Sequence, residues 1–326
     1  VEHKMILGFK GLFLGITDGA TQMLMDFCLV GEKGKNGTYS LKQKQLDARF
    51  TKERKAESHT AKRIKEYDES KITLMIEMIK RLIARKIHFD YILADSWFAC
   101  AEVIKFVTSR HIKCHYLGMI KMGKTKYHYN RKDYTAKALV ALFDHPKKGR
   151  KYSRCLGCYY VVVDVEFAGR KVRLFFTKRN KKSDWNALIT TNTKLEFKEA
   201  YRIYSMRWSL EVVFKDSKGN LGLGKYQMRN FASQIACTAI TAIQYNILAT
   251  ARRFSSYETI GGLFREVTRN SVELTITERI WGMVIDIVNE IAQCFEIEDE
   301  KIFETLINRS DKLQHFIQIY ELKMAS

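Results

Sequence analysis

Residues 201–223 constrain this chain more than any other stretch, because one helical face there would collect charged and phenolic side chains. The stretch reads YRIYSMRWSLEVVFKDSKGNLGL. Residues separated by three, four or seven positions share one side of an α-helix, which turns by about 100° per residue. This spacing predicts a polar face formed by Tyr204, Arg207, Glu211 and Lys218. An apolar stripe beside it predicts packing on a core, through Met206, Leu210, Val213 and Phe214.

The same stretch also fits an ordinary surface helix. Arg207 and Glu211 stand four residues apart, and ion pairs at that spacing are common on solvated helices. The stretch alone leaves both interpretations open, so the rest of the chain has to decide between them.

The charge of the chain indicates a polyanionic partner. The formal net charge is +20 and the isoelectric point is near 9.6, which favours nucleic acid over a small metabolite. Residues 271–326 hold 5 Lys and Arg against 11 Asp and Glu, a net of −6, so residues 1–270 hold 51 against 25, a net of +26. The basic body is therefore where a nucleic acid is expected to lie.

Cysteine usage and hydropathy argue against two classes of protein. The 7 Cys are odd in number and scattered, which fits reduced cytosolic thiols and not a disulfide framework. No apolar run approaches the roughly 20 residues that span a bilayer. We therefore expect no membrane partner.

Short β-rich runs dominate the N-terminal part. Residues 5–17 and 21–29 flank an Asp-Gly pair, a strong signal for a hairpin. Asp18 is then most simply a turn residue, and Asp26 lies at the rim of the second strand. Residues 31–69 are polar and rich in Lys and Arg, and they fit either a solvated helical excursion or a basic arm on DNA phosphates.

A buried strand that ends in a carboxylate is the second informative feature. A helix capped by Ser70 precedes it, with apolar positions between residues 72 and 83. Residues 91–94 form an apolar run typical of a central strand, and Asp95 follows directly. Sheets of the α/β class place their chemistry at such strand ends. An alternative is that Asp95 caps a helix over residues 99–109.

Residues 121–182 form a basic, β-rich insertion. They hold 18 Lys and Arg against 4 Asp and Glu, with tyrosines between the cations. Residues 159–167 and 171–177 predict a β-hairpin. Cations for phosphates beside aromatic rings for bases indicate a nucleic-acid surface. The single Cys-x-x-Cys pair, Cys155 and Cys158, predicts zinc only weakly.

Further strands and helices surround this insertion. Strands are expected over residues 114–122 and 185–191. A long apolar helix over residues 232–254 is expected to bury against the sheet, and residues 280–295 and 301–320 fit amphipathic helices of a tail.

Asp95 and Glu211 are the candidate metal ligands. Both are carboxylates in a chain suited to a polyanion, and hard cations such as Mg²⁺ take carboxylate oxygens. Two such ions can activate the attacking oxygen and stabilise the leaving one in phosphoryl transfer. A site for two ions usually has a third carboxylate as well.

With these features the chain resembles DDE transposases of the insertion-sequence class, the IS-four-like group. The signature Y-x2-R-x3-E-x6-K falls on Tyr204, Arg207, Glu211 and Lys218. The strand-end Asp95 and the insertion between the two acidic residues add to the likeness.

The resemblance implies an α/β fold of the ribonuclease-H-like type, a mixed sheet flanked by helices. A basic β-rich insertion would precede the catalytic helix, and a helical tail would follow. The implied regions are the first part of the core, the insertion, the second part of the core and the tail, at residues 1–120, 121–183, 184–265 and 266–326.

The resemblance also implies roles and partners. Asp95 and Glu211 would bind Mg²⁺, or Mn²⁺ in its place, as the family's second and third acidic residues. The residues implied to hold DNA are Tyr204, Arg207, Lys215 and Lys218. Trp185 would stack a flipped base or, alternatively, only pack in the sheet. The partners would be double-stranded DNA, as terminal inverted repeats and target, and a second copy on paired ends, in the bacterial cytoplasm at the nucleoid.

One departure from the family concerns its first Asp. That Asp lies on a strand ahead of the one that residues 8–15 resemble, and no Asp precedes them here. Asp18 and Asp26 are poor substitutes, since one lies in a turn and the other in a later strand. We therefore expect a shortened transposase that binds DNA but is weak or inactive alone. The alternatives are a non-catalytic DNA-binding protein that kept the scaffold and a nuclease of the same fold.

Overall fold

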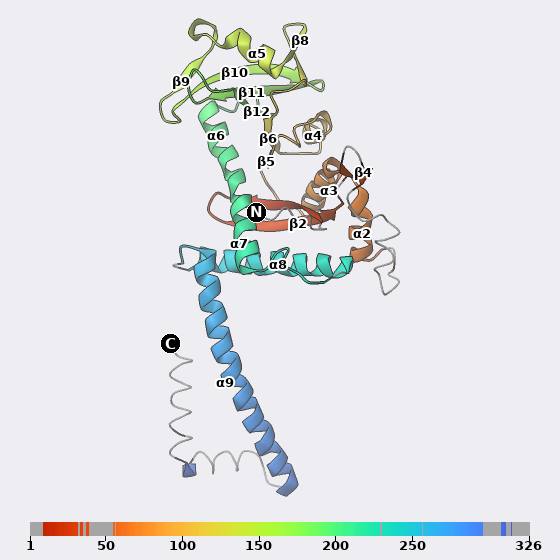
Figure 1. Cartoon of the computed structure of the whole chain (residues 1–326), viewed down its shortest axis with the longest axis vertical. Helices are drawn as coiled ribbons and strands as arrows, with labels where there is room; N and C mark the ends of the chain where they lie inside the picture. The colour runs from red at the N-terminus through yellow and green to blue at the C-terminus, as the bar shows by residue number, and fades with distance from the viewer. Residues whose placement is uncertain are drawn as a thin grey trace. The chain divides into compact units, whose positions relative to one another are not determined.

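Segments with alternating and with helical sequence patterns form the strands and helices of a mixed α/β fold (Figure 1). The computed structural model describes residues 9–31, 33–34, 37–38, 55, 57–228, 230–255, 257–295, 308–310 and 314. The chain divides into two compact units, residues 1–256 and residues 257–326.

The strands are β1 (Lys10–Thr17), β2 (Gln22–Val30), β3 (Lys33–Gly34), β4 (Gly37–Thr38), β5 (Tyr91–Ala94), β6 (His115–Ile120), β7 (Lys126–Tyr129), β8 (Lys132–Thr135), β9 (Lys151–Ser153), β10 (Cys158–Phe167), β11 (Arg170–Lys178) and β12 (Asn186–Thr190). The α-helices are α2 (His59–Lys65), α3 (Lys71–Ala84), α4 (Ala101–Val107), α5 (Ala136–Phe143), α6 (Phe197–Ser205), α7 (Ser209–Asn220), α8 (Phe231–Arg253) and α9 (Ile260–Phe295). The described residues also form the 3-10 turns η1 (Glu66–Asp68), η2 (Pro146–Lys148) and η3 (Met206–Trp208).

The larger sheet has the strand order β5-β6-β12-β11-β10-β7-β8, with β9 beside β10. It is mixed, because β5 and β6 run parallel while the other neighbours run antiparallel. The strands of the basic stretch, β7 to β11, continue this same sheet through the pairing of β11 with β12.

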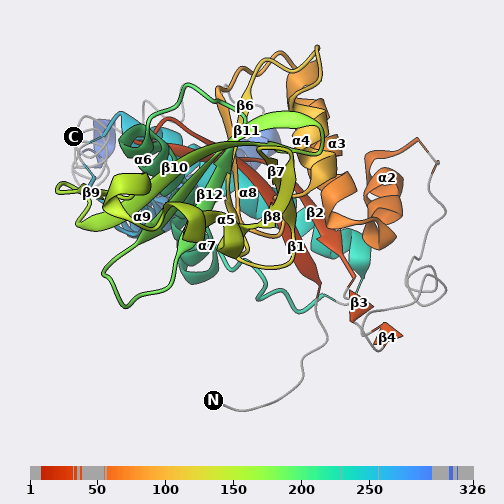
Figure 2. The same cartoon turned by 90° about the horizontal axis from the view of Figure 1, so that it is seen from above.

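Helices cover both faces of the larger sheet. Successive side chains of a strand point to opposite faces. On β11, Leu174 and Phe176 therefore pack in one cluster with residues of α3, α4 and α5, while Phe175 packs with Phe197 of α6. Figure 2 shows α6 on the other side of the strands from α3 and α4.

The N-terminal strands form the expected hairpin, a separate sheet of β1 and β2. Asp18 lies in its turn, where Oδ1 accepts the N–H groups of Ala20 and Thr21 at 3.0 and 2.8 Å. One side of β2 packs on α3 and the other on α8. The turn residue predicted at position 18 is thus confirmed.

The predicted single helix from residue 196 onward is interrupted at η3. Ser205 Oγ donates to the carbonyl of Arg202 at 2.7 Å, the acceptor that the Met206 N–H would use in an α-helix. The Met206 N–H bonds instead to Ile203 and Tyr204 carbonyls, which tightens the turn. Gly222, with φ of +70°, lies just beyond the end of α7.

Helix α8 confirms the expected long helix, but only one of its faces is buried. Tyr245 and Leu248 face the interior, whereas Ile240, Ile243 and Ile247 are 54%, 59% and 62% exposed. The prediction that it buries against the sheet is therefore wrong for this outer face. No described helix combines the length and apolarity needed to cross a membrane.

In the second unit, α9 includes the helix expected over residues 280–295 and begins twenty residues earlier, at Ile260. The helix expected over residues 301–320 lies largely outside the described residues. Of the proposed basic arm at residues 31–69, residues 39–54 also lie outside them, and residues 59–65 form helix α2.

Candidate functional site

Asp95 stands exposed immediately after β5. Its Oδ1 accepts the backbone N–H of Trp97 at 2.8 Å. Helix α4 begins at Ala101, and its N-cap is Cys100, without a side-chain hydrogen bond. The alternative that Asp95 caps this helix is therefore wrong, and the carboxylate is open to a ligand.

A row of polar side chains crosses the junction of α6, η3 and α7. The guanidinium of Arg207 lies 5.9 Å from the ring centroid of Tyr204. Its NH1 also lies 3.2 Å from Oε1 of Glu211, whose side chain is 45% exposed. The 3-10 turn thus keeps Arg207 between the phenol and the carboxylate.

Tyr204 connects this row with the strand-end carboxylate. Burial raises the pKa of Tyr204, the nearby Asp95 carboxylate raises it further, and Arg207 opposes the shift. Tyr204 packs in the cluster that includes Met119 of β6, and β6 is the parallel neighbour of β5. The fold therefore brings the end of β5 to the polar row, and Tyr204 remains a protonated hydroxyl at neutral pH.

Two lysines extend the row along α7. Lys215 and Lys218 are exposed, and neither forms an ion pair with another residue that the structure describes. Both ammonium groups are therefore available to an external anion. Figure 1 shows α6 and α7 in one line that runs from the larger sheet to α8.

Trp185 directly precedes β12, a central strand of the larger sheet, and packs against the main core cluster. Its indole N–H donates to Oδ2 of Asp144 at 3.3 Å, and Nζ of Lys178 lies 4.4 Å from its ring centroid. Asp144 is itself held by Lys178 and Arg150, at 2.7 and 2.9 Å. These contacts agree with the packing alternative, and a role in stacking a base stays a prediction.

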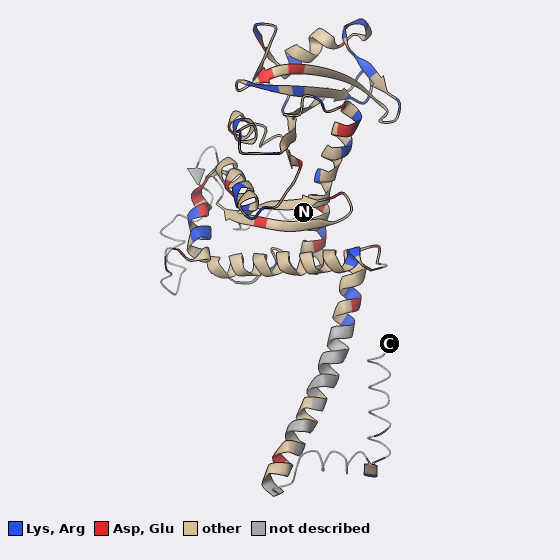
Figure 3. Ribbon diagram, turned by 180° about the vertical axis from the view of Figure 1, so that it is seen from behind, with Lys and Arg blue, Asp and Glu red and all other residues tan. Residues whose placement is uncertain are grey.

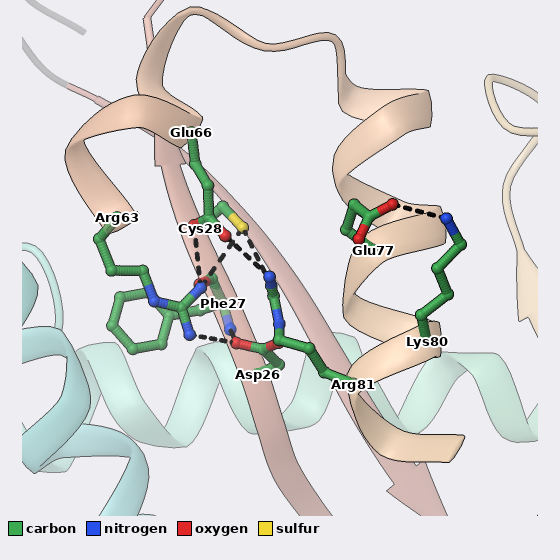
Figure 4. Close-up of polar contacts among 8 residues, drawn as sticks. All are labelled: Asp26, Phe27, Cys28, Arg63, Glu66, Glu77, Lys80 and Arg81. Atoms are coloured by element: carbon green, nitrogen blue, oxygen red, sulfur yellow. Dashed lines mark hydrogen bonds and ion pairs between the residues drawn. The ribbon is translucent and has the colours of Figure 1, made fainter. Parts of the chain in front are cut away.

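Asp26 lies in a buried ion cluster (Figure 4). It is 7% exposed, pairs with Arg63, and accepts from Nε of Arg81 at 2.7 Å. Glu66 bridges the same two arginines, at 3.0 and 2.9 Å. Two cations therefore neutralise this carboxylate, which agrees with its being a poor metal ligand.

No sequence pattern predicted this ion cluster. Asp26 is 37 residues from Arg63 and 55 from Arg81, so no local sequence period connects them.

Burial, with a contribution from Glu66, raises the pKa of the neighbouring Cys28 thiol to about 12. This cysteine is consequently an unreactive core residue.

The candidate ligands are of the chemical type that Mg²⁺ binds, but too few of them lie together to complete a metal site. Asp95 and Glu211 offer the carboxylate oxygens that hard cations take. Within the described parts of the chain, however, no three His, Cys, Asp or Glu residues lie together as a metal site. The Cys155 and Cys158 pair accordingly has no third ligand there for zinc.

Comparison with known proteins adds to this geometry. The family model described as "Transposase DDE domain" matches residues 59–247, more than half of the chain. No curated protein matches. Among solved structures, a cryo-EM structure of the piggyBac transposase synaptic complex with hairpin DNA is similar, with 11% identity and a TM-score of 0.40. The match covers 65% of this chain and 42% of that one, so this chain corresponds to less than half of that transposase.

Proposed function

Because the chain belongs to the family of transposase DDE domains, we propose that it cleaves and transfers DNA strands in cut-and-paste transposition. Mg²⁺ is the proposed cofactor, and Mn²⁺ can replace it. The observation that supports the proposal is the polar row of Tyr204, Arg207 and Glu211, in which Tyr204 lies near the Asp95 carboxylate that follows β5.

Asp95 and Glu211 are the proposed metal ligands. Bound Mg²⁺ would stabilise charge on the scissile phosphate and lower the pKa of a bound water. Glu211 can turn from Arg207 toward an ion at small cost, since an exposed ion pair contributes only about 0–1 kcal/mol. Arg207 would then be free to bind a phosphate.

The remaining polar groups of the site are proposed to hold the DNA backbone. Tyr204 is a hydroxyl donor, Arg207 offers a planar fork suited to phosphate oxygens, and Lys215 and Lys218 supply further positive charge. These four residues would fix the strand so that its phosphodiester lies beside Asp95.

A ribonuclease-H-like core is the proposed fold. The parallel pair β5 and β6, the carboxylate after β5 and the helix α6 across the sheet support it. The proposed regions are the two parts of the core at residues 1–120 and 184–265, the insertion at 121–183 and the tail at 266–326.

Double-stranded DNA is the proposed partner, as terminal repeats and as target, at the nucleoid in the cytoplasm. Figure 3 shows Lys and Arg along the loops and strands of the β-rich part. The net charge of +26 on residues 1–270 supplies the long-range attraction.

A second copy of the chain is the other proposed partner, and α8 is the proposed contact. Its residues 231–251 contain no charged side chain, and the helix is tan along nearly its whole length in Figure 3. Copies with a large positive charge repel one another, so an uncharged, exposed apolar face is where they can meet.

The exposed face of α8 is also suited to pairing with itself. In an antiparallel two-fold pair centred between Ile243 and Gln244, those two residues would meet. Ile240 would meet Ile247, and Ala236 would meet Ala251. A two-fold interface requires this self-complementarity. One helix pair buries less than the roughly 1,600 Å² of a standard interface, so association should depend on concentration.

The experiment that tests the function compares two glutamates. Wild type, Glu211→Gln and Glu199→Gln are incubated with supercoiled plasmid carrying the terminal repeats, with Mg²⁺ or Mn²⁺. Glu199 is the matched control, because it forms an exposed ion pair with Arg202 on α6. We expect all three to bind DNA, wild type and Glu199→Gln to cleave it weakly, and Glu211→Gln not to cleave it.

The outcomes separate the alternatives. Metal-dependent cleavage by Glu211→Gln would show that this residue is not a required metal ligand. Wild type that binds the DNA and never cleaves it would favour the non-catalytic DNA-binding protein. Cleavage without transfer of a pre-cut end would favour the nuclease.

A further inference from the structure

The two-residue turn between β7 and β8 has an arginine where glycine is usual. Asn130 and Arg131 have φ of +45° and +62°. Tight hairpin turns require this left-handed conformation, which glycine and asparagine adopt readily and other side chains adopt at a cost. The corresponding turn between β10 and β11 has glycine at this position, Gly169, with φ of +72°. The backbone of the β7–β8 turn therefore does not account for the arginine side chain.

The guanidinium of Arg131 is open to an external ligand. Arg131 is exposed, and it forms no hydrogen bond or ion pair with another residue that the structure describes. Lys132, the next residue, is exposed as well. The nearby Asp133 is bonded to His128 instead, with Oδ1 and Nδ1 3.0 Å apart. The tip of the hairpin therefore presents positive charge to solvent.

The base of this hairpin is fixed in the core. Tyr127 is 2% exposed, and its ring centroid lies 5.2 Å from that of Phe167. The ring of Tyr129 meets that of Phe143 edge-on, with centroids 5.6 Å apart. Because β8 is the last strand in the order of the larger sheet, the tip stands at one side of the sheet while its base is held. A hairpin fixed in this way loses little conformational entropy on binding.

The tip lies at the same edge of the larger sheet as Asp95. Strands β5 and β6 are parallel, and four antiparallel pairings lead from β6 through β12, β11 and β10 to β7. Strand β7 therefore runs in the same direction as β5. Five to six strand spacings separate their ends, which is about 24–29 Å at about 4.8 Å each. Duplex DNA of that length has about seven to nine base pairs.

A single arginine on a narrow turn suits the minor groove of DNA. That groove is about 6 Å wide, whereas the major groove admits a whole two-stranded ribbon. A ribbon in the major groove would bring the exposed Asp133 close to phosphates, which repel a carboxylate. In A·T-rich DNA the minor groove is narrower and more negative, and it attracts inserted arginine side chains.

We propose that the β7–β8 turn enters the minor groove of the bound DNA, with Arg131 inserted and Lys132 on an adjacent phosphate. The contact lies about seven to nine base pairs from the phosphodiester at Asp95, and it favours an A·T-rich tract there. The inference rests on the proposed function, because the base pairs are counted from the cleaved phosphate.

The test uses the full chain without divalent metal, so that binding is measured and not cleavage. Two duplexes share one free end and one base composition, and streptavidin blocks the far end. An A·T-rich tract is centred about eight base pairs from the free end in the first duplex and about half a helical turn further in the second. We expect wild type to bind the first ~5-fold more tightly by fluorescence anisotropy, the low end of what one base-contacting side chain provides.

The variants are Arg131→Gln, Arg131→Gly and Arg170→Gln. Arg170 is the control, because it is exposed and follows the β10–β11 turn, which lies at the opposite edge of the sheet. Both variants of Arg131 should bind the two duplexes equally, and Arg170→Gln should keep the preference. Arg131→Gly should also unfold at the same urea concentration as wild type or a higher one, since glycine adopts a positive φ freely.

The results also separate this contact from the proposed function. Equal affinity of wild type for the two duplexes would overturn the minor-groove contact and leave the transposase proposal standing. So would a preference that persists in Arg131→Gln, or one that Arg170→Gln loses to the same extent. A lower urea midpoint for Arg131→Gly would also overturn the contact, because the arginine would then stabilise the turn. Failure of wild type to bind either duplex would overturn both proposals.

Discussion

At the scale of single residues, the surroundings of each carboxylate decide what it can do. Asp26 and Asp95 both belong to the β-rich framework, yet Asp26 is buried between two arginines and Asp95 is exposed with one hydrogen bond. A carboxylate that already has two cationic partners gains little from a metal ion. Asp95 has none, so an incoming ion replaces only water.

Changing Asp26→Asn should destabilise the fold, because it leaves two partly buried arginines with one acidic partner, Glu66. Removing one partner of a buried pair costs about 3–5 kcal/mol. Arg63 and Arg81 are 24% and 35% exposed, so we expect ~2–3 kcal/mol in urea unfolding. Glu77→Gln breaks an exposed pair with Lys80 and should cost less than ~1 kcal/mol. Equal losses in the two variants would contradict this description of the cluster.

Changing Lys218→Gln should weaken DNA binding without affecting stability, because the exposed ammonium is proposed to contact a phosphate. Losing one phosphate contact lowers the slope of log affinity against log salt by about 1. Lys80→Gln is the control, since that exposed lysine already pairs with Glu77. The slope is measured by fluorescence anisotropy over a salt series. An unchanged slope in Lys218→Gln would show that this lysine does not contact a DNA phosphate.

At the scale of elements, one side chain of α8 forms two hydrogen bonds with the backbone of the N-terminal hairpin. Oδ1 of Asn246 accepts the N–H of Leu24 at 2.8 Å, and its Nδ2 donates to the Leu24 carbonyl at 2.7 Å. The register of β1 and β2 shifts close to this point, between Leu14 and Gly15. The amide thus satisfies the strand backbone there and fixes the hairpin on the helix.

Changing Asn246→Ala should therefore cost about 1–3 kcal/mol, the penalty for leaving backbone groups without partners. Thr250→Ala, one turn further along and exposed, should stay within ~0.5 kcal/mol. Urea unfolding gives the free energies, and hydrogen exchange at Leu24 gives the local effect. Unchanged exchange at Leu24 in Asn246→Ala would show that the hairpin does not depend on this contact.

At the scale of the whole molecule, charge distinguishes the surface proposed to bind DNA from the surface proposed to bind a second copy. The basic body can attract DNA, and the uncharged face of α8 is the proposed site for a second copy. Changing Ile243→Lys places a charge at the centre of that face and should shift the association toward monomer. Val162→Lys, on the exposed side of β10, is the control. Sedimentation velocity over a concentration series measures the shift, and a dimer that persists in Ile243→Lys would place the contact elsewhere.

Much of the framework could be predicted from local pattern. The Asp-Gly turn, the β10 and β11 hairpin, the Ser70 cap and the strand before Asp95 are confirmed, because each depends on neighbours in sequence. The interruption at η3 was missed. It arises from one hydroxyl that competes for a helix carbonyl, an effect weaker than the periodicity that predicts the helix.

The sequence by itself determined the elements, the basic charge and the signature of acidic and phosphate-binding residues, since these follow from composition and short spacings. Only the tertiary structure decided which carboxylate is exposed and which is neutralised, that Tyr204 lies near Asp95, and that Trp97 rather than Trp185 faces solvent. The physical reason is that burial and charge pairing depend on contacts between segments distant along the chain. A local sequence pattern does not show such contacts.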